Sequence, residues 1–204
     1  RAGHRGRRDV IAPQEEVTRV LVHRTCATWI VIQASASRLL GHLEEERMVV
    51  RTLPMELLDQ KGISYHVHRH EEHQFTAEGV AQDLGVPVSQ VVKAMLVRCD
   101  GSWYVLVVVP GDQRLSLEKV QASVGAGKVN LASKREVERV TGYTVGAVSV
   151  IGLRQGGVLT FVDQGVLNLE QVIISSGRPD AGLALSPDDM MKALEGAQVG
   201  EFCE

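Results

Sequence analysis

Lys93 is the side chain of this sequence with the clearest capacity for chemistry, because it is the only charged residue in an apolar segment. Its neighbours in Val91-Val92-Lys93-Ala94-Met95-Leu96-Val97 are all apolar. Removing a lone ammonium group from water is costly, so such a lysine is paired, extends to solvent, or lies at the wall of a pocket that binds an anion or a carbonyl. Taken alone, the segment also fits the simpler case of a strand-edge lysine whose head reaches water.

A second candidate is a glycine-rich segment, Thr141-Gly142-Tyr143-Thr144-Val145-Gly146-Ala147-Val148-Ser149, with Gly152 shortly after it. Glycines at this density let the backbone approach a ligand closely and point successive N–H groups at one oxygen atom. That arrangement would stabilise an oxyanion, although an ordinary loop has the same composition. The chain has no G-x-x-x-x-G-K-[ST] or G-x-G-x-x-G motif, so a nucleotide-phosphate loop is not supported.

Two further candidates are weaker. The first is the group His66, His68, His70 and His73: in a strand the first three share one face, and this row could bind zinc if a fourth ligand came near. In a strand, however, His66 and His68 fall on the face opposite its apolar residues, where they face solvent. Cys99 adjoins a turn signal, and the sequence shows no activating group beside it for nucleophilic catalysis. We therefore predict no metal and no other cofactor.

Composition limits the classes of function. The net charge of −3 argues against binding to nucleic acid through bulk electrostatics, so any RNA contact is expected on one face only. The three cysteines, Cys26, Cys99 and Cys203, form no C-x-x-C motif, which favours a reducing compartment and predicts a cytoplasmic protein. The longest uncharged run is too short to cross a bilayer, so no membrane association is expected.

The chain changes character near residue 50. The first 50 residues carry eight arginines and no lysine, whereas all six lysines lie from Lys61 onward. The later part has 14 basic and 19 acidic residues. We interpret residues 1–51 as an extension of uncertain status and residues 52–204 as the functional domain.

The elements that must position these candidates are short and interleaved. Capping residues and glycines predict helices, and apolar runs or alternation predict strands. A hairpin is expected around Asp100-Gly101, between a strand that begins at Lys93 and an almost wholly apolar strand. These signals predict an α+β fold with a mixed, barrel-like β-sheet flanked by short helices. The expected helices are 53–61, 76–84, 116–124, 133–141 and 186–195, and the expected strands are 63–70, 93–98, 103–109, 129–132, 158–163, 171–175 and 181–185.

Five segments of the chain follow one another in a characteristic order. They are Phe75-Thr76-Ala77-Glu78, Val91 to Val97, Pro110-Gly111-Asp112, Thr141 to Gly146, and Ile174-Ser175-Ser176-Gly177-Arg178. No single segment is specific, but their order and spacing together are. Together they resemble the YbaK/EbsC family, the free-standing relatives of the editing domain inserted in bacterial prolyl-tRNA synthetases. The resemblance runs from about Thr52 to about Gly200.

The resemblance implies a compact mixed β-barrel with flanking helices that removes a wrong amino acid from the 3′ end of tRNA. Its substrate would be of the Cys- or Ala-tRNA(Pro) type, its partner the tRNA 3′ aminoacyl end, and prolyl-tRNA synthetase a further candidate partner. No Ser-His-Asp order or G-x-S-x-G motif is present, as expected if an already activated ester needs mainly a positioned water and an oxyanion site. The alternative is a noncatalytic binding module of the same fold, which recognises aminoacyl-tRNA ends or a protein partner.

The resemblance also implies site residues. Lys93 matches the family lysine, and the loop Gly146, Ala147, Val148 and Ser149 matches the loop whose amides hold the aminoacyl carbonyl. Two positions depart from the family pattern: Val150 stands where the family has proline, and Ala94 where threonine is often found. Substrate-binding positions map onto His70, Phe75, Thr76, Asp163, Ser175, Ser176, Gly177 and Arg178.

Overall fold

The computed structural model describes residues 50–70 and 76–204. The chain divides into two compact units after Val49, and the description below concerns the second, Val50–Glu204. The predicted extension, residues 1–51, therefore lies almost entirely outside the described residues. His73 and Phe75 lie outside them as well.

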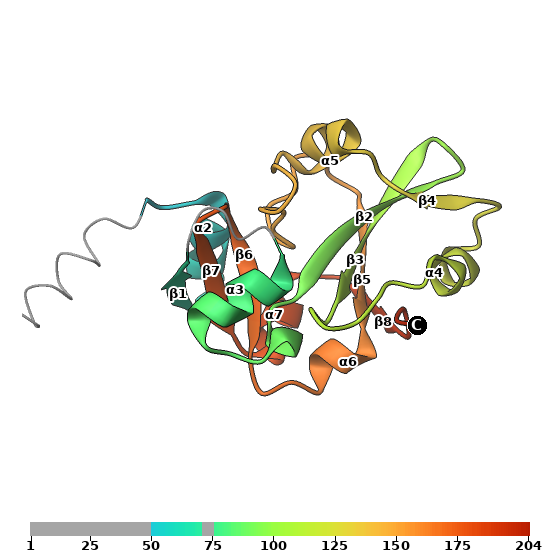
Figure 1. The fold of residues 1–204 in the computed structure, drawn as a ribbon. Helices are drawn as coiled ribbons and strands as arrows, with labels where there is room; N and C mark the ends of the chain where they lie inside the picture. Colours follow the sequence, from blue (N-terminus) through green and yellow to red (C-terminus); the bar gives the residue numbers. More distant parts are fainter. Residues whose placement is uncertain (1–49, 71–75) are drawn as a thin grey trace, which may run out of the picture. The chain divides into compact units, whose positions relative to one another are not determined.

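The strands form two sheets (Figure 1). The smaller sheet is antiparallel, with the order β1 (His66–Arg69), β7 (Ala181–Leu185) and β6 (Val172–Arg178). The larger sheet is mixed, because β5 pairs in parallel with both of its neighbours. Its order is β4 (Val129–Leu131), β2 (Lys93–Cys99), β3 (Trp103–Val109), β5 (Leu159–Asp163) and β8 (Gln198–Gly200).

The predicted α+β class is confirmed, but the described strands form two sheets and no closed barrel. Outside the named strands, a single parallel bridge joins the sheets where Val91 meets Ile173, and the amide of Val92 donates to the carbonyl of Ile173 at 3.1 Å. The edge strands β4 and β8 have only three residues each. Strands this short offer few ladder hydrogen bonds at either edge of the larger sheet.

The predicted helices are present, with each bound shifted by at most two residues. They are α2 (Leu53–Gln60), α3 (Ala77–Leu84), α4 (Leu117–Val124), α5 (Lys134–Thr141) and α7 (Pro187–Ala193). The hydroxyls of Thr76, Ser116 and Ser186 each accept a hydrogen bond from the amide three residues later, which satisfies one of the unpaired donors at a helix start. A 3₁₀ turn, η1 (Val88–Gln90), follows α3. Two short elements were not predicted: α6 (Gln164–Leu167) and β8.

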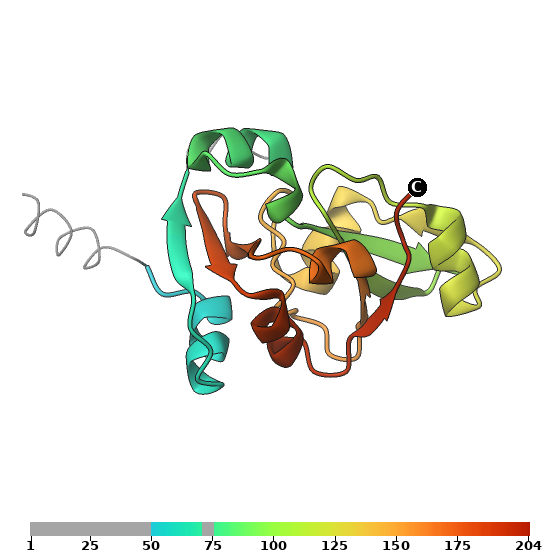
Figure 2. The same cartoon turned by 90° about the horizontal axis from the view of Figure 1, so that it is seen from below.

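Helices lie on both faces of the central hairpin of β2 and β3, α4 on one face and α5 on the other (Figures 1 and 2). Its turn has positive φ at Asp100 and Gly101, 46° and 74°, the two left-handed residues that a type I′ turn requires. On one face, Val97 and Val105 pack with Val120 of α4 in a buried core cluster. The adjacent cross-strand pair, Arg98 and Tyr104, faces the other way and contacts α5. No helix among the described residues is long and apolar enough to cross a membrane.

Candidate functional site

A cavity of about 480 Å³ is bounded by residues of both sheets. Its walls come from the start of β2, from β6 and the first residue of β7, from α3, from the first turn of α5, and from the loop that follows α5. The bridge between Val91 and Ile173 holds the two sheets together at this place, and both residues line the cavity. The cavity therefore lies where segments far apart in the sequence converge.

Lys93 lines this cavity at the first position of β2 and is half-buried. Its ammonium group donates a hydrogen bond to the carbonyl oxygen of Gln113 at 2.5 Å. An ammonium group has three donors, so this contact leaves two for other acceptors. The Gln113 carbonyl thus anchors the charged head next to the cavity.

The Pro110-Gly111-Asp112 segment has a structural reason to carry glycine. A Cβ atom on Gly111 would lie 2.3 Å from the carbonyl oxygen of Val88 and 2.4 Å from that of Val91, so only glycine fits. The turn is closed by the amide of Gln113, which donates to the carbonyl of Pro110 at 3.1 Å. This close packing fixes Gln113, the acceptor for Lys93, against the start of β2.

The glycine-rich loop contributes Gly146 and Val148 to the cavity wall. The amide of Ala147 donates to the carbonyl of Thr144 at 3.0 Å, which makes a β-turn with Gly146 at its third position. Gly146 has φ +91°, and a positive φ at this position favours glycine. Among the described residues, no partner is present for the amides of Gly146 and Val148. These two N–H groups are therefore available to a ligand, whereas that of Ala147 is not.

The loop starts at the C-terminal end of α5, and the residues at the end of the loop are hydrogen-bonded back to the same end of the helix. The amide of Arg154 donates to the carbonyl of Thr141 at 2.9 Å, and that of Gln155 to the carbonyl of Val140 at 3.0 Å. Inside the loop, the hydroxyl of Tyr143 donates to the carbonyl of Ile151 at 2.8 Å. Burial raises the pKa of Tyr143 to about 12, so the hydroxyl keeps its proton at neutral pH. Tyr143 therefore braces the segment that carries Gly146 and Val148.

We did not predict a role for Tyr143, although a signal was present. It is an aromatic residue directly after the helix-ending Gly142, in a segment otherwise made of small residues and valine. A large ring in such a segment needs a surface to pack on. That surface is Gly177, where a Cβ atom would lie 2.7 Å from a ring carbon of Tyr143.

Gly177 belongs to a β-bulge at the end of β6, where the register with β7 shifts between Ser175 and Arg178. The side chains of Ser175 and Arg178 line the cavity, whereas Ser176 is buried and its hydroxyl donates to the carbonyl of Ala181 at 2.8 Å. Bulges of this kind redirect side chains beside functional sites. Arg178 also forms a two-point ion pair with Asp180, both contacts at 2.7 Å, and this lowers the pKa of that carboxyl group.

Asp163 does not line this cavity. Its carboxylate accepts hydrogen bonds from the amides of Gly165 at 2.8 Å, Phe202 at 2.6 Å and Cys203 at 3.1 Å. It thus begins α6 and attaches the C-terminal segment to β5. A buried carboxylate with these acceptor sites occupied has a clear structural role.

The predicted site residues thus fall into two groups. Those that line the cavity are His70, Thr76, Lys93, Gly146, Val148, Ser175 and Arg178. Those that lie behind its wall or away from it are Ala147, Ser149, Asp163, Ser176 and Gly177; Phe75 lies outside the described residues.

The structure also bears on the two weaker candidates. Within residues 50–70 and 76–204, no group of histidine, cysteine, aspartate and glutamate side chains could hold a metal ion. Cys99 is fully buried in the core cluster beneath α4, and burial raises the pKa of its thiol. Burial also raises the pKa of Cys203, to about 12, and its hydrogen bond to Asp163 adds to the shift. Neither thiol lines the cavity, and neither is activated.

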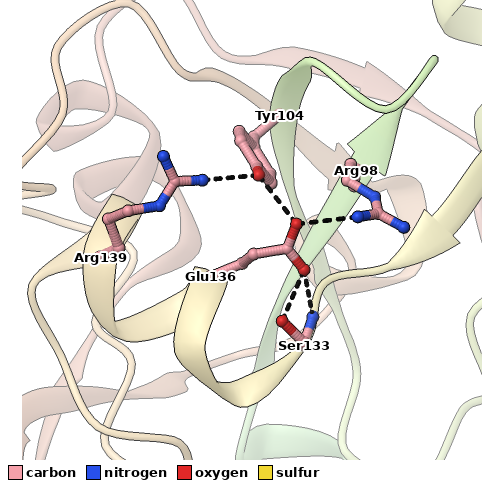
Figure 3. Close-up of polar contacts among 5 residues, drawn as sticks. All are labelled: Arg98, Tyr104, Ser133, Glu136 and Arg139. Atoms are coloured by element: carbon pink, nitrogen blue, oxygen red, sulfur yellow. Dashed lines mark hydrogen bonds and ion pairs between the residues drawn. The ribbon is translucent and has the colours of Figure 1, made fainter.

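A polar network positions the N-terminal end of α5 at the cavity (Figure 3). The carboxylate of Glu136 accepts hydrogen bonds from the amide and hydroxyl of Ser133 at 2.8 and 2.6 Å and from the hydroxyl of Tyr104 at 2.9 Å. It also pairs with Arg98 at 3.0 Å. The bonds from Ser133, followed by that from Tyr104, lower the pKa of Glu136 to about 2. The helix that supplies Lys134 and Val137 to the cavity is therefore fixed to β2 and β3.

Comparisons with known proteins define the class of this chain. Residues 71–193 match the model of the aminoacyl-tRNA editing domain. The chain belongs to this family, and its predicted likeness to the YbaK/EbsC group and to the prolyl-tRNA synthetase editing domain is confirmed.

Three similar proteins illustrate the relationship. The chain is 26% identical over 148 residues to "Putative Cys-tRNA(Pro)/Cys-tRNA(Cys) deacylase EbsC" of Enterococcus faecalis, which covers 72% of this chain and 90% of that protein. It is 37% identical over 93 residues to the proline--tRNA ligase of Geobacter metallireducens, which is 46% of this chain but only 16% of the ligase. A solved structure described as "a putative trans-editing enzyme for prolyl tRNA synthetase" has 29% identity and a TM-score of 0.66, covering 73% of this chain and 93% of the other.

Proposed function

We propose that this protein is a trans-editing hydrolase that deacylates mischarged aminoacyl-tRNA of the Cys- or Ala-tRNA(Pro) type. The observation that carries the proposal is the convergence on one cavity of Lys93 with the amides of Gly146 and Val148, which have no partner among the described residues. Membership of the aminoacyl-tRNA editing family and similarity to EbsC support it. The partner is the 3′ aminoacyl end of the tRNA, and prolyl-tRNA synthetase is a further candidate partner.

Hydrolysis of an aminoacyl ester requires few catalytic groups from the protein. An aminoacyl ester is already activated, so hydrolysis needs a water held near the carbonyl carbon and donors for the oxyanion that forms. The amides of Gly146 and Val148 donate to that oxyanion, and the free donors of Lys93 bind the terminal nucleotide. The water adds to the carbonyl carbon, the ester C–O bond breaks, and the ribose oxygen leaves with a proton.

The charge of the cavity supports a nucleotide ligand. Among its described lining residues are four basic side chains, His70, Lys93, Lys134 and Arg178, and no acidic one. The described unit, by contrast, contains more acidic than basic residues. Arg178 is paired with Asp180, so Lys93 and Lys134 supply the positive charge of this site, which matches an RNA end that carries phosphates.

A noncatalytic binding module of the same fold is the second candidate. Two observations favour it: Val150 replaces the loop proline of the family, and the Lys93 ammonium already donates to the Gln113 carbonyl. Val150 is buried, so the loop is held there by packing rather than by a fixed φ. In this case the cavity would bind the aminoacyl-tRNA end or a protein partner without hydrolysis.

The deciding experiment is deacylation of purified proline tRNA charged with cysteine, alanine or serine. We expect release of at least one of these amino acids and a loss of about 100-fold in kcat/KM for Lys93→Ala, the scale of losing one electrostatic contact at a reacting centre. Thiol and methyl side chains differ by only about 1–3 kcal/mol in pocket affinity, so comparing the three substrates is what identifies the amino acid.

Lys119→Ala is the matched control. The Lys119 ammonium donates to the Cys203 carbonyl at 2.6 Å, much as Lys93 donates to Gln113, but Lys119 does not line the cavity. This variant should deacylate like the wild type. Wild-type protein that binds the three tRNAs but releases none of the amino acids would instead establish the binding module.

A further inference from the structure

The rim of the cavity carries a set of exposed residues that the hydrolytic mechanism does not use. Leu131, Lys134 and Val145 all line the cavity and are exposed. Leu131 is 50% exposed and Val145 49%. Single exposed apolar residues need no explanation, but two on the rim of one cavity form a surface that a ligand can cover.

At this rim, the ammonium group of Lys134 contacts no acceptor among the described residues. Among the described residues, the ammonium groups of Lys61, Lys93, Lys119 and Lys192 each contact an acceptor. Those of Lys128 and Lys134 do not, and of these two only Lys134 lines the cavity. Its charge is therefore available to the part of a ligand that extends out of the cavity.

The nearest carboxylate in sequence does not neutralise Lys134. Glu136 lies two residues later, and its oxygens accept from Ser133, Tyr104 and Arg98 instead. Figure 3 shows the carboxylate directed to that network. The same bonds keep Glu136 ionised and occupied, so no carboxylate among the described residues pairs with Lys134 at the rim.

We propose that Lys134 binds a backbone phosphate of the RNA strand on the 5′ side of the terminal nucleoside, where the strand passes between Leu131 and Val145. This inference rests on the proposed function, since it requires an aminoacyl-RNA end in the cavity. The half-buried Lys93 then contacts the terminal nucleotide, and the exposed Lys134 contacts the strand one or more nucleotides away. The apolar rim residues border the nucleotide bases.

Arg135 provides a matched control. It is the next residue of the same helix turn, is exposed and carries the same charge, but does not line the cavity. Lys134→Ala and Arg135→Ala therefore change the net charge equally and differ only in the position of the lost charge.

The first measurement is the binding of uncharged proline tRNA at several salt concentrations. Lys134→Ala should weaken binding about 5- to 10-fold at low salt and reduce the slope of log K against log[salt] by about 0.7, the value for one contact to a single strand. Lys134→Arg should restore both. Arg135→Ala should leave the slope within error of wild type. Equal slopes for Lys134→Ala and Arg135→Ala would overturn the proposal.

The second measurement separates this inference from the proposed function. An aminoacyl ester of adenosine alone has no phosphate on its 5′ side, so Lys134→Ala should hydrolyse it as fast as wild type while losing kcat/KM on charged tRNA. Equal losses on both substrates would refute the role of Lys134 in phosphate binding, yet leave the hydrolase intact. Wild-type protein that hydrolyses neither substrate would remove the proposed function, and the salt dependence of tRNA binding would still decide the role of Lys134.

Discussion

The two ends of α5 are held by opposite kinds of interaction, although both position walls of the same cavity. At the N-terminal end, the charged and polar network around Glu136 fixes the turn that carries Lys134 (Figure 3). At the C-terminal end, neutral hydrogen bonds and the packing of Tyr143 on Gly177 fix the loop that carries Gly146 and Val148. The first kind depends on charge and on pH, whereas the second depends on volume and backbone conformation.

This difference suits what each end contributes. The loop must hold two amides at the site of an oxyanion, and small errors in such positions are costly to catalysis. Close packing resists displacement because protein interiors tolerate little change in volume. The N-terminal end presents a flexible lysine side chain at the surface, where charge matters more than exact position. Substitutions at the N-terminal end should therefore change how stability depends on pH, whereas substitutions at the loop end should change stability through side-chain volume and backbone conformation.

The largest effect is expected for Gly177→Ala. Gly177 has φ +87°, which costs an L-residue about 1–2 kcal/mol, and its new Cβ atom would lie 2.7 Å from the Tyr143 ring. Repacking against such a clash adds about 1–3 kcal/mol, so we expect a loss of about 2–5 kcal/mol in the free energy of unfolding. Urea unfolding measures it, and deacylation should fall as the loop moves.

Gly157→Ala separates the two causes of this loss. Gly157 has φ +79°, and no atom would lie within 4 Å of an added Cβ. An alanine at this position therefore has the conformational cost without the clash. A loss of about 1–2 kcal/mol is expected there. If both variants lose the same amount, the packing of Tyr143 on Gly177 contributes nothing and the contrast between the two ends fails.

Much of this architecture could be predicted from sequence, for local reasons. Thr76, Ser116 and Ser186 begin helices at the expected positions, because a hydroxyl beside free amides acts without reference to the rest of the fold. Asp100-Gly101 likewise determines its own turn. The short elements α6 and β8 carry too few residues for a periodic pattern, and β8 forms only because β5 offers it an edge.

The site was less predictable, because its contacts join distant segments. Nothing local to Asp163 indicates that Phe202 and Cys203 will donate to it across some forty positions. The ring of Tyr143 and the glycine that receives it are also far apart, and only the fold brings Gly177 beneath the ring. The split of the barrel-like sheet into two sheets has the same origin, since the single bridge between Val91 and Ile173 depends on tertiary packing.

An intermediate effect is expected for Tyr143→Phe, which keeps the ring and removes the hydroxyl. The buried carbonyl of Ile151 loses its donor, for an expected loss of about 1–2 kcal/mol at pH 7. Burial raises the pKa of Tyr143 to about 12, above its usual value of 10.0, so its stabilisation is complete below about pH 10 and is lost as the pH rises toward 12. Urea midpoints of the two proteins should therefore converge between pH 10 and 12. A difference that stays constant across this range would show that the hydroxyl is not buried in the native state.

The smallest effect is expected for Glu136→Gln, because interactions of exposed charges are screened by water. The hydrogen bonds from Ser133, then that from Tyr104, lower the pKa of Glu136 from 4.5 to about 2. A carboxyl group with a lowered folded-state pKa stabilises the protein fully above its unfolded value, and this stabilisation is lost as the pH falls through the folded value. The wild type should thus exceed the variant in stability at pH 7, and the difference should shrink from about pH 4.5 to about pH 2.

Glu138→Gln is the control for this prediction. Glu138 lies on the same helix, and its side chain makes no hydrogen bond or ion pair among the described residues. The variant removes the same charge from α5 but leaves the network intact, so at pH 7 it should lose less stability than Glu136→Gln. Equal losses would mean that the net charge of α5 matters and the network does not, and the N-terminal end would then need another anchor.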